Sequence, residues 1–532
     1  MKREFDFLVV GSGVAGLSFA IKVAEFGTVA IVTKSKLADT NTALAQGGIA
    51  AVTYLPDNFE KHIEDTYIAG DRFSNKEVVR IVVEEAPQRI QELIDWGTQF
   101  DKNKSGQYDL AREGGHSEKR ILHHKDNTGW EIQRALIDFV KTHPNITIFE
   151  NYFSVELLTQ HHLGKTVHRS NTNIECYGAY VLNMEKGLVE TFLAKKTMIA
   201  TGGTGNLYQT TTNPEIATGD GVAMVYRAKG IVENIEFVQF HPTSLYNPTE
   251  KPSYLITEAM RGFGAILRNR QGKEFMQKYD RRGALAPRDI VSRAIDNELK
   301  FYGDDFVYLD CRHLDGASLK DHFPNISAKC LSLGIDIATD LIPVVPAAHY
   351  QCGGVKVDLN GESHIKHLYA SGEVASTGLH GANRLASNSL SEAVVFSHRA
   401  AMHAIECFKN QTICKEIPEW NFEGTTMPEE MVLITQNYKE TQMIMSNYVG
   451  IVRSNLRLER AMKRLKIIFE ETDELYKKST LSQPLCELRN LINVAYLIIK
   501  GAQNRKESLG LHYNIDYPPK NEPQSMNNIS EL

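Results

Sequence analysis

The sequence Gly11-Ser12-Gly13-Val14-Ala15-Gly16 follows a short apolar run, Phe5 to Val10, and opens a helix-like pattern from Leu17 to Phe26. This order predicts a strand, a glycine-rich turn and a helix, which together form a dinucleotide-binding unit. The first glycine permits a tight turn, the second lets the backbone approach a pyrophosphate, and the third lets the helix pack close to the strand. The N-terminus of that helix then presents unpaired N–H groups to phosphate.

The composition is that of a globular protein. The chain has 532 residues, of which 42% are hydrophobic and 23% charged, and this length suggests about two to four domains. The formal net charge of -6 gives no sign of nucleic-acid binding. We see no run of roughly 18 apolar residues that could cross a membrane. Because Lys2 and Arg3 lead directly into the first strand, we expect no signal peptide and a cytoplasmic location.

Neither the cysteines nor the histidines suggest a metal site. The seven cysteines are scattered and form no CxxC pair, so we expect reduced thiols and neither an iron–sulfur cluster nor a structural zinc. His123 and His124 are adjacent, but consecutive side chains do not share a helix face. The sequence therefore predicts no metal.

Two segments after the glycine turn bear on the kind of nucleotide. The second strand, Val29 to Val32, runs into Thr33-Lys34-Ser35, where many NAD-binding folds place an acid that holds the ribose. A simple NAD site is therefore disfavoured. Residues 41–51 are small, polar and flexible, which suits either a backbone lying against a flat ligand or an ordinary loop.

Apolar periodicity predicts helices over residues 77–97 and 129–141, and the segment 146–198 resembles an inserted antiparallel sheet. We expect an α/β fold. A Rossmann-like dinucleotide-binding domain occupies 1–250 and 351–425, with an α+β domain inserted at 251–350. A C-terminal helical domain, 426–532, contains helices at 430–447, 450–478 and 484–505, and its tail after Pro518 is expected to be disordered. The basic residues Arg453, Arg457, Arg460, Lys463 and Arg464 indicate a solvated helix face rather than a docking surface.

Polar motifs recur at element boundaries throughout the chain, in the order GSGVAG, AQGGIAA, REGGHS, ATGG, QFHPT, TEAMRG, PRDIVSRA, PAAHYQCGGV, YASGEV and HGANRLASNSL. With these motifs the chain resembles the flavoprotein family of succinate dehydrogenase and fumarate reductase, from residue 5 to about 517. Within that family it is most similar to the members that oxidise L-aspartate. The resemblance implies that the inserted domain caps the cofactor.

The resemblance also implies that the cofactor is FAD. Membrane-bound members of the family attach FAD to a histidine before the AQGG loop, and Asn41 occupies the matching position, so we expect noncovalent FAD. The positions matching cofactor contacts, together with the glycine turn itself, are Gly11, Ser12, Gly13, Val14, Ala15, Gly16, Lys34, Asn41, Thr42, Ala43, Leu44, Ala45, Gln46, Gly47, Gly48, Asp220, Glu373, Ser389 and Leu390.

The reaction implied is the oxidation of L-aspartate to iminoaspartate by hydride transfer to flavin, as the first step towards quinolinate and NAD, with oxygen or fumarate as the final acceptor. A functional link to quinolinate synthase would follow. His241, Thr257, His349 and Arg384 match the family's substrate-binding positions. The forked guanidinium of Arg384 suits one of the substrate's two carboxylates.

Arg288 matches the family's acid/base arginine, and Glu258 and Arg261 match its proton relay. Arginine keeps its proton in water, so it acts as an acid only beside groups that exchange protons with it. We expect Arg288 to transfer a proton when fumarate is reduced. In amine oxidation, a role limited to orienting the substrate and stabilising it electrostatically is the alternative.

Glu113, in REGGH, is the candidate for choosing between substrates, because a carboxylate would pair with the ammonium that distinguishes aspartate from succinate. Alternatively, Glu113 is a loop carboxylate paired with Arg112 or Arg120. Two other functions are open: the flavoprotein subunit of a fumarate reductase or succinate dehydrogenase, against which Asn41 and Glu113 argue, and a flavin-binding protein without turnover whose basic helices at 450–466 bind a partner.

Overall fold

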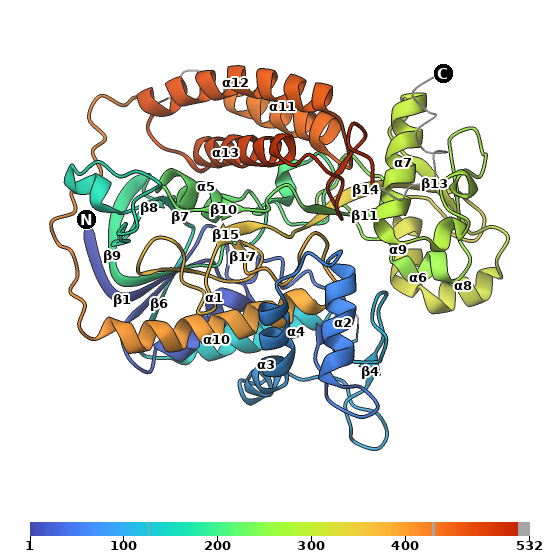
Figure 1. The fold of residues 1–532 in the computed structure, drawn as a ribbon, viewed down its shortest axis with the longest axis horizontal. Helices are drawn as coiled ribbons and strands as arrows, with labels where there is room; N and C mark the ends of the chain where they lie inside the picture. The colour runs from blue at the N-terminus through green and yellow to red at the C-terminus, as the bar shows by residue number, and fades with distance from the viewer. Residues whose placement is uncertain (126, 428–430, 520–532) are drawn as a thin grey trace.

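The computed structural model describes residues 1–125, 127–427 and 431–519. A β-sheet forms the middle layer, with the C-terminal helices on one face and α1, α3 and α10 on the other (Figure 1). A region containing α6 to α9 lies at one end of these layers (Figure 1). The two faces of the sheet are therefore covered by segments that are far apart in sequence.

The glycine-rich turn joins a strand of the main sheet to a helix, as the sequence predicts. In the described residues this sheet has seven strands, in which β1 (Lys2–Val10) lies between β2 (Val29–Thr33) and β9 (Leu188–Ile199) and is parallel to both. Helix α1 (Val14–Val23) begins directly after the turn. The strand Val29–Thr33 is fully buried and is apolar from Val29 to Val32, because helices cover both faces of a parallel sheet.

The segment 146–198 is not a separate insertion. Strand β6 (Ile146–Glu150) pairs in parallel with β2, whereas β8 (Gly178–Asn183) pairs antiparallel with β9 and β7 (Tyr152–Leu157) pairs antiparallel with β8. The antiparallel strands belong to the main sheet because β9 is long. Its 12 residues pair first with β8, as far as Leu193, and then with β16 (Leu368–Ala370), from Thr197 onward. One long strand thus joins the antiparallel and parallel parts.

Three long helices form the C-terminal region: α11 (Val432–Val449), α12 (Asn455–Lys478) and α13 (Gln483–Asn504). Their apolar side chains share one core with the sheet and with α5 (Asp220–Arg227). On the opposite face, α3 (Lys76–Asp95), α4 (Thr128–Thr142) and α10 (Asn388–Phe408) pack with α1. In the described ranges, no helix is both long and apolar enough to cross a membrane. The predicted disordered tail after Pro518 lies almost entirely outside the described residues.

The predicted basic helix face is wrong at Arg453. This side chain is fully buried, since it lies in β18 (Val452–Arg453), paired with β19 (Tyr513–Asn514), before α12 begins. Its Nε donates to the carbonyls of Val449 and Gly450 at 3.0 and 3.1 Å, and its Nη1 lies 2.8 Å from Nδ1 of His512. Lys463 and Arg464 are exposed, as predicted.

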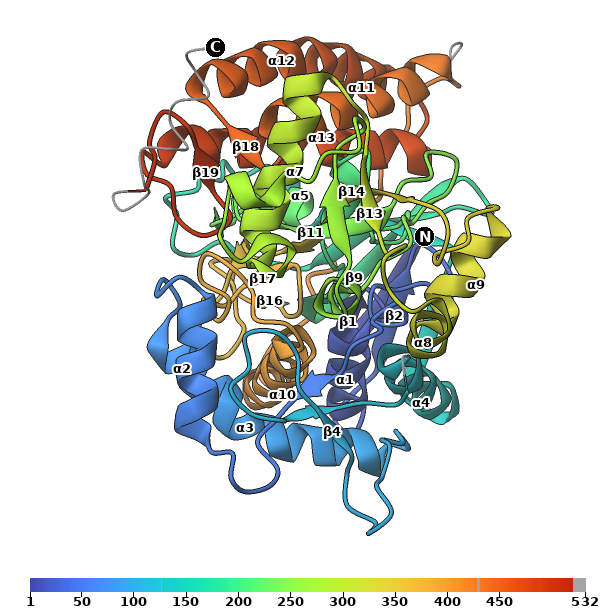
Figure 2. The same cartoon turned by 90° about the vertical axis from the view of Figure 1, so that its right-hand side faces the viewer.

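The region at the end of the layers has its own sheet and core. Strands β11 (Val238–Leu245), β14 (Ile342–Gln351), β13 (Val307–Asp310) and β12 (Ile266–Arg268) pair antiparallel in that order. Against them lie α6 (Glu258–Gly262), α7 (Arg288–Tyr302), α8 (Gly316–His322) and α9 (Pro324–Ser332), of which Figure 2 shows α7, α8 and α9 towards the viewer. The sheet begins at Val238, before the predicted boundary at 251, so the strands that enter and leave this cap extend into the main domain.

Candidate active site

A cavity of about 1080 Å³ lies between the carboxyl ends of the parallel strands and the cap. Ligands of open α/β sheets bind at this edge. Its walls come from the glycine turn, the 41–48 loop, the REGGH loop, the end of β9, the start of α10 and the cap. The cavity thus gathers the motifs that the sequence separates by hundreds of residues.

The glycine turn requires glycine at its first position. Gly11 has φ +111°, and a Cβ placed there would lie 2.1 Å from the carbonyl oxygen of Ala200 at the end of β9. A Cβ on Gly16 would lie 2.2 Å from the carbonyl oxygen of Gly11, so this glycine lets α1 pack against the strand and does not line the cavity. The N-cap residue of α1 is Gly13, which has no side chain to cap the helix, and the first helical N–H, that of Val14, donates to Thr42 Oγ1 at 3.1 Å. The N–H groups that follow Val14 in the first turn point towards where a phosphate would bind at a helix N-terminus.

We therefore expect Gly11→Ala to be purified without bound cofactor and with a lowered melting temperature. The methyl group and the disfavoured backbone angle force Ala200 and the turn apart, and backbone strain of this kind costs about 1–3 kcal/mol before the clash is counted. Flavin absorbance of the purified protein and its thermal unfolding measure the two effects. Gly187→Ala is the matched control, because Gly187 also has a positive φ of +63° but a Cβ added there would meet no atom within 4 Å.

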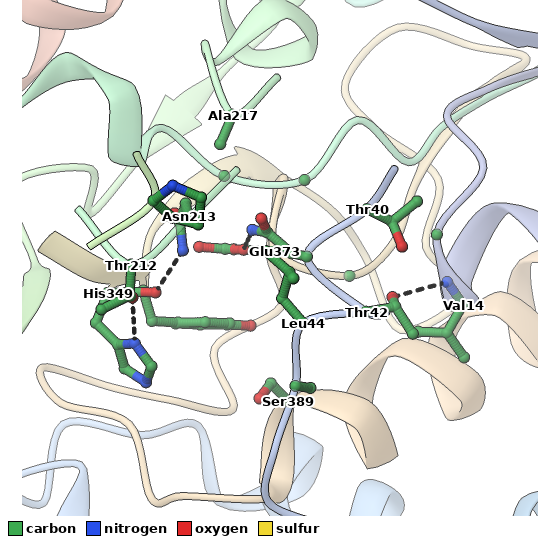
Figure 3. Close-up of a pocket in the computed structure, with 18 of the residues that line it drawn as sticks. Val14, Thr40, Thr42, Leu44, Thr212, Asn213, Ala217, His349, Glu373 and Ser389 are labelled. Atoms are coloured by element: carbon green, nitrogen blue, oxygen red, sulfur yellow. Dashed lines mark hydrogen bonds between the residues drawn. The ribbon is translucent and has the colours of Figure 1, made fainter. Parts of the chain in front are cut away.

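The 41–48 loop lies against the cavity, and hydrogen bonds to other segments hold it there. Thr42 Oγ1 accepts from the backbone N–H of Val14 at 3.1 Å, which ties the loop to the start of α1 (Figure 3). Asn41 Nδ2 donates to Glu373 Oε2 at 2.8 Å, while in the described residues its buried Oδ1 has no partner. Ala43 is the one residue of this stretch that does not line the cavity. The backbone-against-ligand interpretation of this loop is thereby favoured.

Lys34 replaces the expected acid after the second strand and forms a largely buried ion-pair cluster. Its Nζ donates to Asp220 Oδ2 at 2.7 Å, to Glu487 Oε1 at 2.6 Å and to Thr218 Oγ1 at 2.6 Å. Burial would lower the pKa of Lys34, but the charges of the two carboxylates outweigh it and raise the pKa. Lys34 and Asp220 both line the cavity, whereas Glu487 reaches them from α13. The C-terminal helices thus support the cofactor wall.

Glu487→Gln should weaken cofactor binding and destabilise the protein by about 1–3 kcal/mol, because Lys34 loses one of two charged acceptors in a buried setting. The affinity of the apoprotein for FAD, followed by quenching of flavin fluorescence, and the free energy of unfolding report this change. Glu474→Gln is the control, since Glu474 pairs only at the surface of α12, with Lys478 at 2.5 Å. Equal affinities for the two variants would argue against a role of α13 in the cofactor site.

Together these features fit FAD. The helix N-terminus and the glycine turn suit a pyrophosphate, and the acidic Asp220 and Glu373 on the cavity wall supply acceptors for hydroxyl groups. Gly203, whose Cβ would lie 2.2 Å from Glu373 Oε1, lets backbone approach this acid closely. Gly202, Gly203 and Ser371 line the same wall but are not among the ligands expected from the sequence, although Gly202 and Gly203 belong to the ATGG motif.

Two histidines from neighbouring strands of the cap meet at the other end of the cavity. His241 lies on β11 and His349 on β14, with ring centroids 5.8 Å apart. Removal from bulk water holds the pKa of both well below the usual value; the charge of Arg288 adds to this at His241 and that of Arg384 at His349. Thr212 Oγ1 lies 2.8 Å from His349 Nδ1, and Asn213 Nδ2 donates to the His349 carbonyl at 3.1 Å (Figure 3).

Arg384 lines the cavity, and the groups that contact its guanidinium are neutral. Its Nη1 donates to Ser389 Oγ at 2.8 Å, its Nε and Nη2 donate to Gln239 Oε1 at 3.2 and 3.0 Å, and its Cζ lies 4.4 Å from the centre of the Tyr350 ring. It forms no ion pair with a carboxylate in the described parts of the chain. A cation held in this way is available for an anionic ligand.

Arg288, at the start of α7, donates from Nε to Glu258 Oε2 at 2.5 Å. Burial would raise the pKa of Glu258, but the charge and hydrogen bond of Arg288, with the charge of Arg261, outweigh it and lower the pKa. Arg261 lies behind the cavity wall, 3.9 Å from Glu258 Oε2, and donates to the Ala284 carbonyl at 2.8 Å. Thr257 caps α6, accepting from the Ala259 N–H at 3.4 Å, and lines the cavity.

Glu113 lines the cavity and is not paired with either arginine considered from the sequence. Arg112 Nε donates to the His116 carbonyl at 2.8 Å, and Arg120 is bound to Asp57 and Asp65. Glu113 Oε2 instead accepts from Ser387 Oγ at 2.6 Å. Of the residues that the sequence predicts for the site, the cavity brings together all but Gly16, Ala43 and Arg261.

The fold and the cavity define an FAD-binding flavoprotein, and comparison with known proteins gives the same class. The family model of the FAD binding domain matches residues 6–390, and that of the fumarate reductase flavoprotein C-terminus matches residues 438–529. An L-aspartate oxidase of Vibrio cholerae is 46% identical over 97% of this chain and 96% of its own length. One of Pseudomonas aeruginosa is also 46% identical, with the same coverage of both chains.

Solved structures extend the likeness to respiratory flavoproteins. Mycobacterium smegmatis Sdh1 in complex with UQ1 is 30% identical, with a TM-score of 0.85 over 98% of this chain and 91% of that one. A mutant E. coli quinol fumarate reductase (FrdA) is 30% identical, with a TM-score of 0.82 over 97% and 91%. The chain belongs to the L-aspartate oxidases, within the flavoprotein family of succinate dehydrogenase and fumarate reductase.

Proposed function

We propose that this protein oxidises L-aspartate to iminoaspartate with FAD as cofactor, and so supplies the precursor of quinolinate in NAD biosynthesis. One observation carries the proposal: Glu113, whose hydrogen-bond partner is the neutral Ser387, shares one cavity with Arg384 and Arg288. A ligand that satisfies this set has carboxylates for the arginines and an ammonium for the acid. L-aspartate has both.

The side chains divide the work of binding between the two ends of the substrate. Arg384 exchanges its neutral acceptors, Gln239 and Ser389, for a carboxylate, and the exchange replaces ordinary hydrogen bonds by charge-assisted ones. Glu113 accepts from the ammonium and fixes which face of the α-carbon is presented to the cofactor. When bound, FAD supplies the acceptor for the hydride that leaves this carbon.

The same site is proposed to reduce fumarate, with Arg288 as the proton donor. The guanidinium of Arg288 gives up a proton to the substrate carbon, and the ionised Glu258, hydrogen-bonded to its Nε, takes a proton from solvent and passes it to the neutral guanidine. Arg261 supports Glu258 from behind the wall through its charge. His241 and His349 stay neutral because of their low pKa and act as hydrogen-bonding groups.

We further propose that FAD is bound noncovalently, because the amide of Asn41 is not a nucleophile suited to forming a flavin link. Oxygen or fumarate would accept the electrons. The unstable iminoaspartate would be passed to quinolinate synthase in the cytoplasm.

The test is flavin bleaching under nitrogen. The purified holoprotein is mixed with L-aspartate or with succinate, and loss of the visible flavin absorbance is followed. Bleaching by L-aspartate and much less by succinate is the expected result. Bleaching by succinate alone would make the protein the flavoprotein subunit of a succinate-oxidising enzyme, and no bleaching by either would leave a flavin-binding protein without this turnover.

A further inference from the structure

Ser387 connects three segments of the cavity wall at one point. Its hydroxyl donates to Glu113 Oε2 at 2.6 Å and accepts from the Gly48 N–H at 3.4 Å. Its carbonyl accepts from the Ala50 N–H at 3.1 Å. The residue therefore joins the REGGH loop, the 41–51 loop and the N-terminus of α10.

The backbone at Ser387 is held in an unfavourable conformation. Its φ is +62°, in the left-handed region that glycine occupies at no steric cost and serine does not. Glycine at this position would keep the turn but lose the hydroxyl. Serine adds a hydroxyl that donates to Glu113 at 2.6 Å and accepts the longer hydrogen bond from the Gly48 N–H at 3.4 Å.

The loop that carries Glu113 is anchored to the same segment at a second point. His116 Nε2 lies 2.9 Å from the Ala386 carbonyl, and His116 Nδ1 lies 3.1 Å from Nη1 of the fully buried Arg120. Arg120 in turn donates two hydrogen bonds of 2.8 Å to the carboxylate of Asp57. This buried cluster fixes the backbone of the REGGH loop, so within that loop the hydroxyl of Ser387 sets the direction of the Glu113 carboxylate.

The two oxygens of Glu113 have different surroundings. Oε2 is taken by Ser387, whereas Oε1 lies beside Gly47, where an added Cβ would approach it to 2.7 Å. Glycine at 47 therefore leaves Oε1 room on the cavity side.

We propose that Ser387 is a positioning residue for substrate choice: its hydroxyl holds Oε2 of Glu113 and thereby directs Oε1 to the ammonium of an amino-dicarboxylate. This inference rests on the proposed function. It assigns discrimination between aspartate and succinate to a pair, Ser387 and Glu113, rather than to Glu113 alone.

The test compares Ser387→Gly and Ser387→Ala with the wild type in the FAD-loaded enzyme. Both variants lack the hydroxyl, but only alanine retains the steric cost of the left-handed backbone. We expect kcat/KM for L-aspartate to fall about tenfold in both, through KM rather than kcat, because one oriented hydrogen bond is worth roughly that factor. Parameters for succinate and the FAD content should change by less than about twofold.

A double-mutant cycle with Glu113→Gln completes the test. If Ser387 acts through Glu113, adding Ser387→Gly to Glu113→Gln should cause no further loss with L-aspartate. Equal losses with both substrates, loss of FAD from Ser387→Gly, or additive losses in the double variant would each overturn the inference and leave the proposed function standing. Failure of the wild type to oxidise L-aspartate would instead remove the proposed function, and the inference with it.

Discussion

Replacing Arg288 with leucine should lower the rate of fumarate reduction by about 10²–10⁴-fold, the contribution of a positioned general acid. Arg288 lines the cavity and is hydrogen-bonded through Nε to Glu258, so leucine removes both the proton donor and the link to the group that restores its proton. Oxidation of L-aspartate should fall less, because there the arginine orients and stabilises the substrate. Anaerobic fumarate reduction by a reduced dye and bleaching by L-aspartate measure the two reactions on one preparation.

Arg293→Leu is the matched control for this variant. Arg293 lies on the same helix, α7, pairs with Asp289 at 2.9 Å and is not part of the cavity wall. It should leave fumarate reduction within about twofold of the wild type, so a loss specific to position 288 reflects its place in the cavity. Wild-type fumarate reduction by Arg288→Leu would refute the acid role.

Local sequence signals predict the central fold because they act over short distances. The alternation of strand, glycine turn and helix between residues 2 and 23 depends on neighbours in sequence, and its key glycine is needed to avoid the adjacent strand end at Ala200. The antiparallel extension of the sheet looks like an insertion in sequence because β9 is longer than its pairing with either β8 or β16. The cluster of basic residues in the sequence likewise does not reveal that Arg453 is buried, because its burial depends on the strand β18 and on the contact with His512, 59 residues away.

The sequence predicts the composition of the site but not its connections. Resemblance supplies Glu113, Arg288 and Arg384 as residues, yet partners in the cavity wall lie far away in sequence: Glu113 and Ser387 are separated by 274 residues, and Lys34 and Glu487 by 453. Thr212 and Asn213, which form hydrogen bonds with His349, belong to none of the sequence motifs quoted above. Such contacts depend on how strands and domains are assembled, and periodicity within a segment contains no information on them.

Neutralising Glu113 should change the substrate that the enzyme prefers. In Glu113→Gln the amide oxygen still accepts a hydrogen bond from the ammonium of L-aspartate, but the charge is lost. Since hydrogen bonds to charged groups contribute about 1.5–3 kcal/mol, kcat/KM for L-aspartate should fall by about 10- to 100-fold. Succinate oxidation should stay the same or rise, because the wild-type Glu113 carboxylate has no ammonium to pair with when succinate is bound, and glutamine removes that unpaired charge. Steady-state kinetics with both substrates give the ratio directly.

Glu118→Gln separates this effect from a general change of the loop. Glu118 lies five positions further along the same segment, pairs with Lys61 at 2.6 Å and is not part of the cavity wall, so its variant should keep the wild-type preference. If the aspartate-to-succinate ratio of Glu113→Gln equals that of the wild type, the ammonium is recognised elsewhere. A lowered ratio for Glu113→Gln and not for Glu118→Gln would mean that the Glu113 carboxylate, held in place by Ser387, recognises the ammonium in a cavity otherwise built for a dicarboxylate.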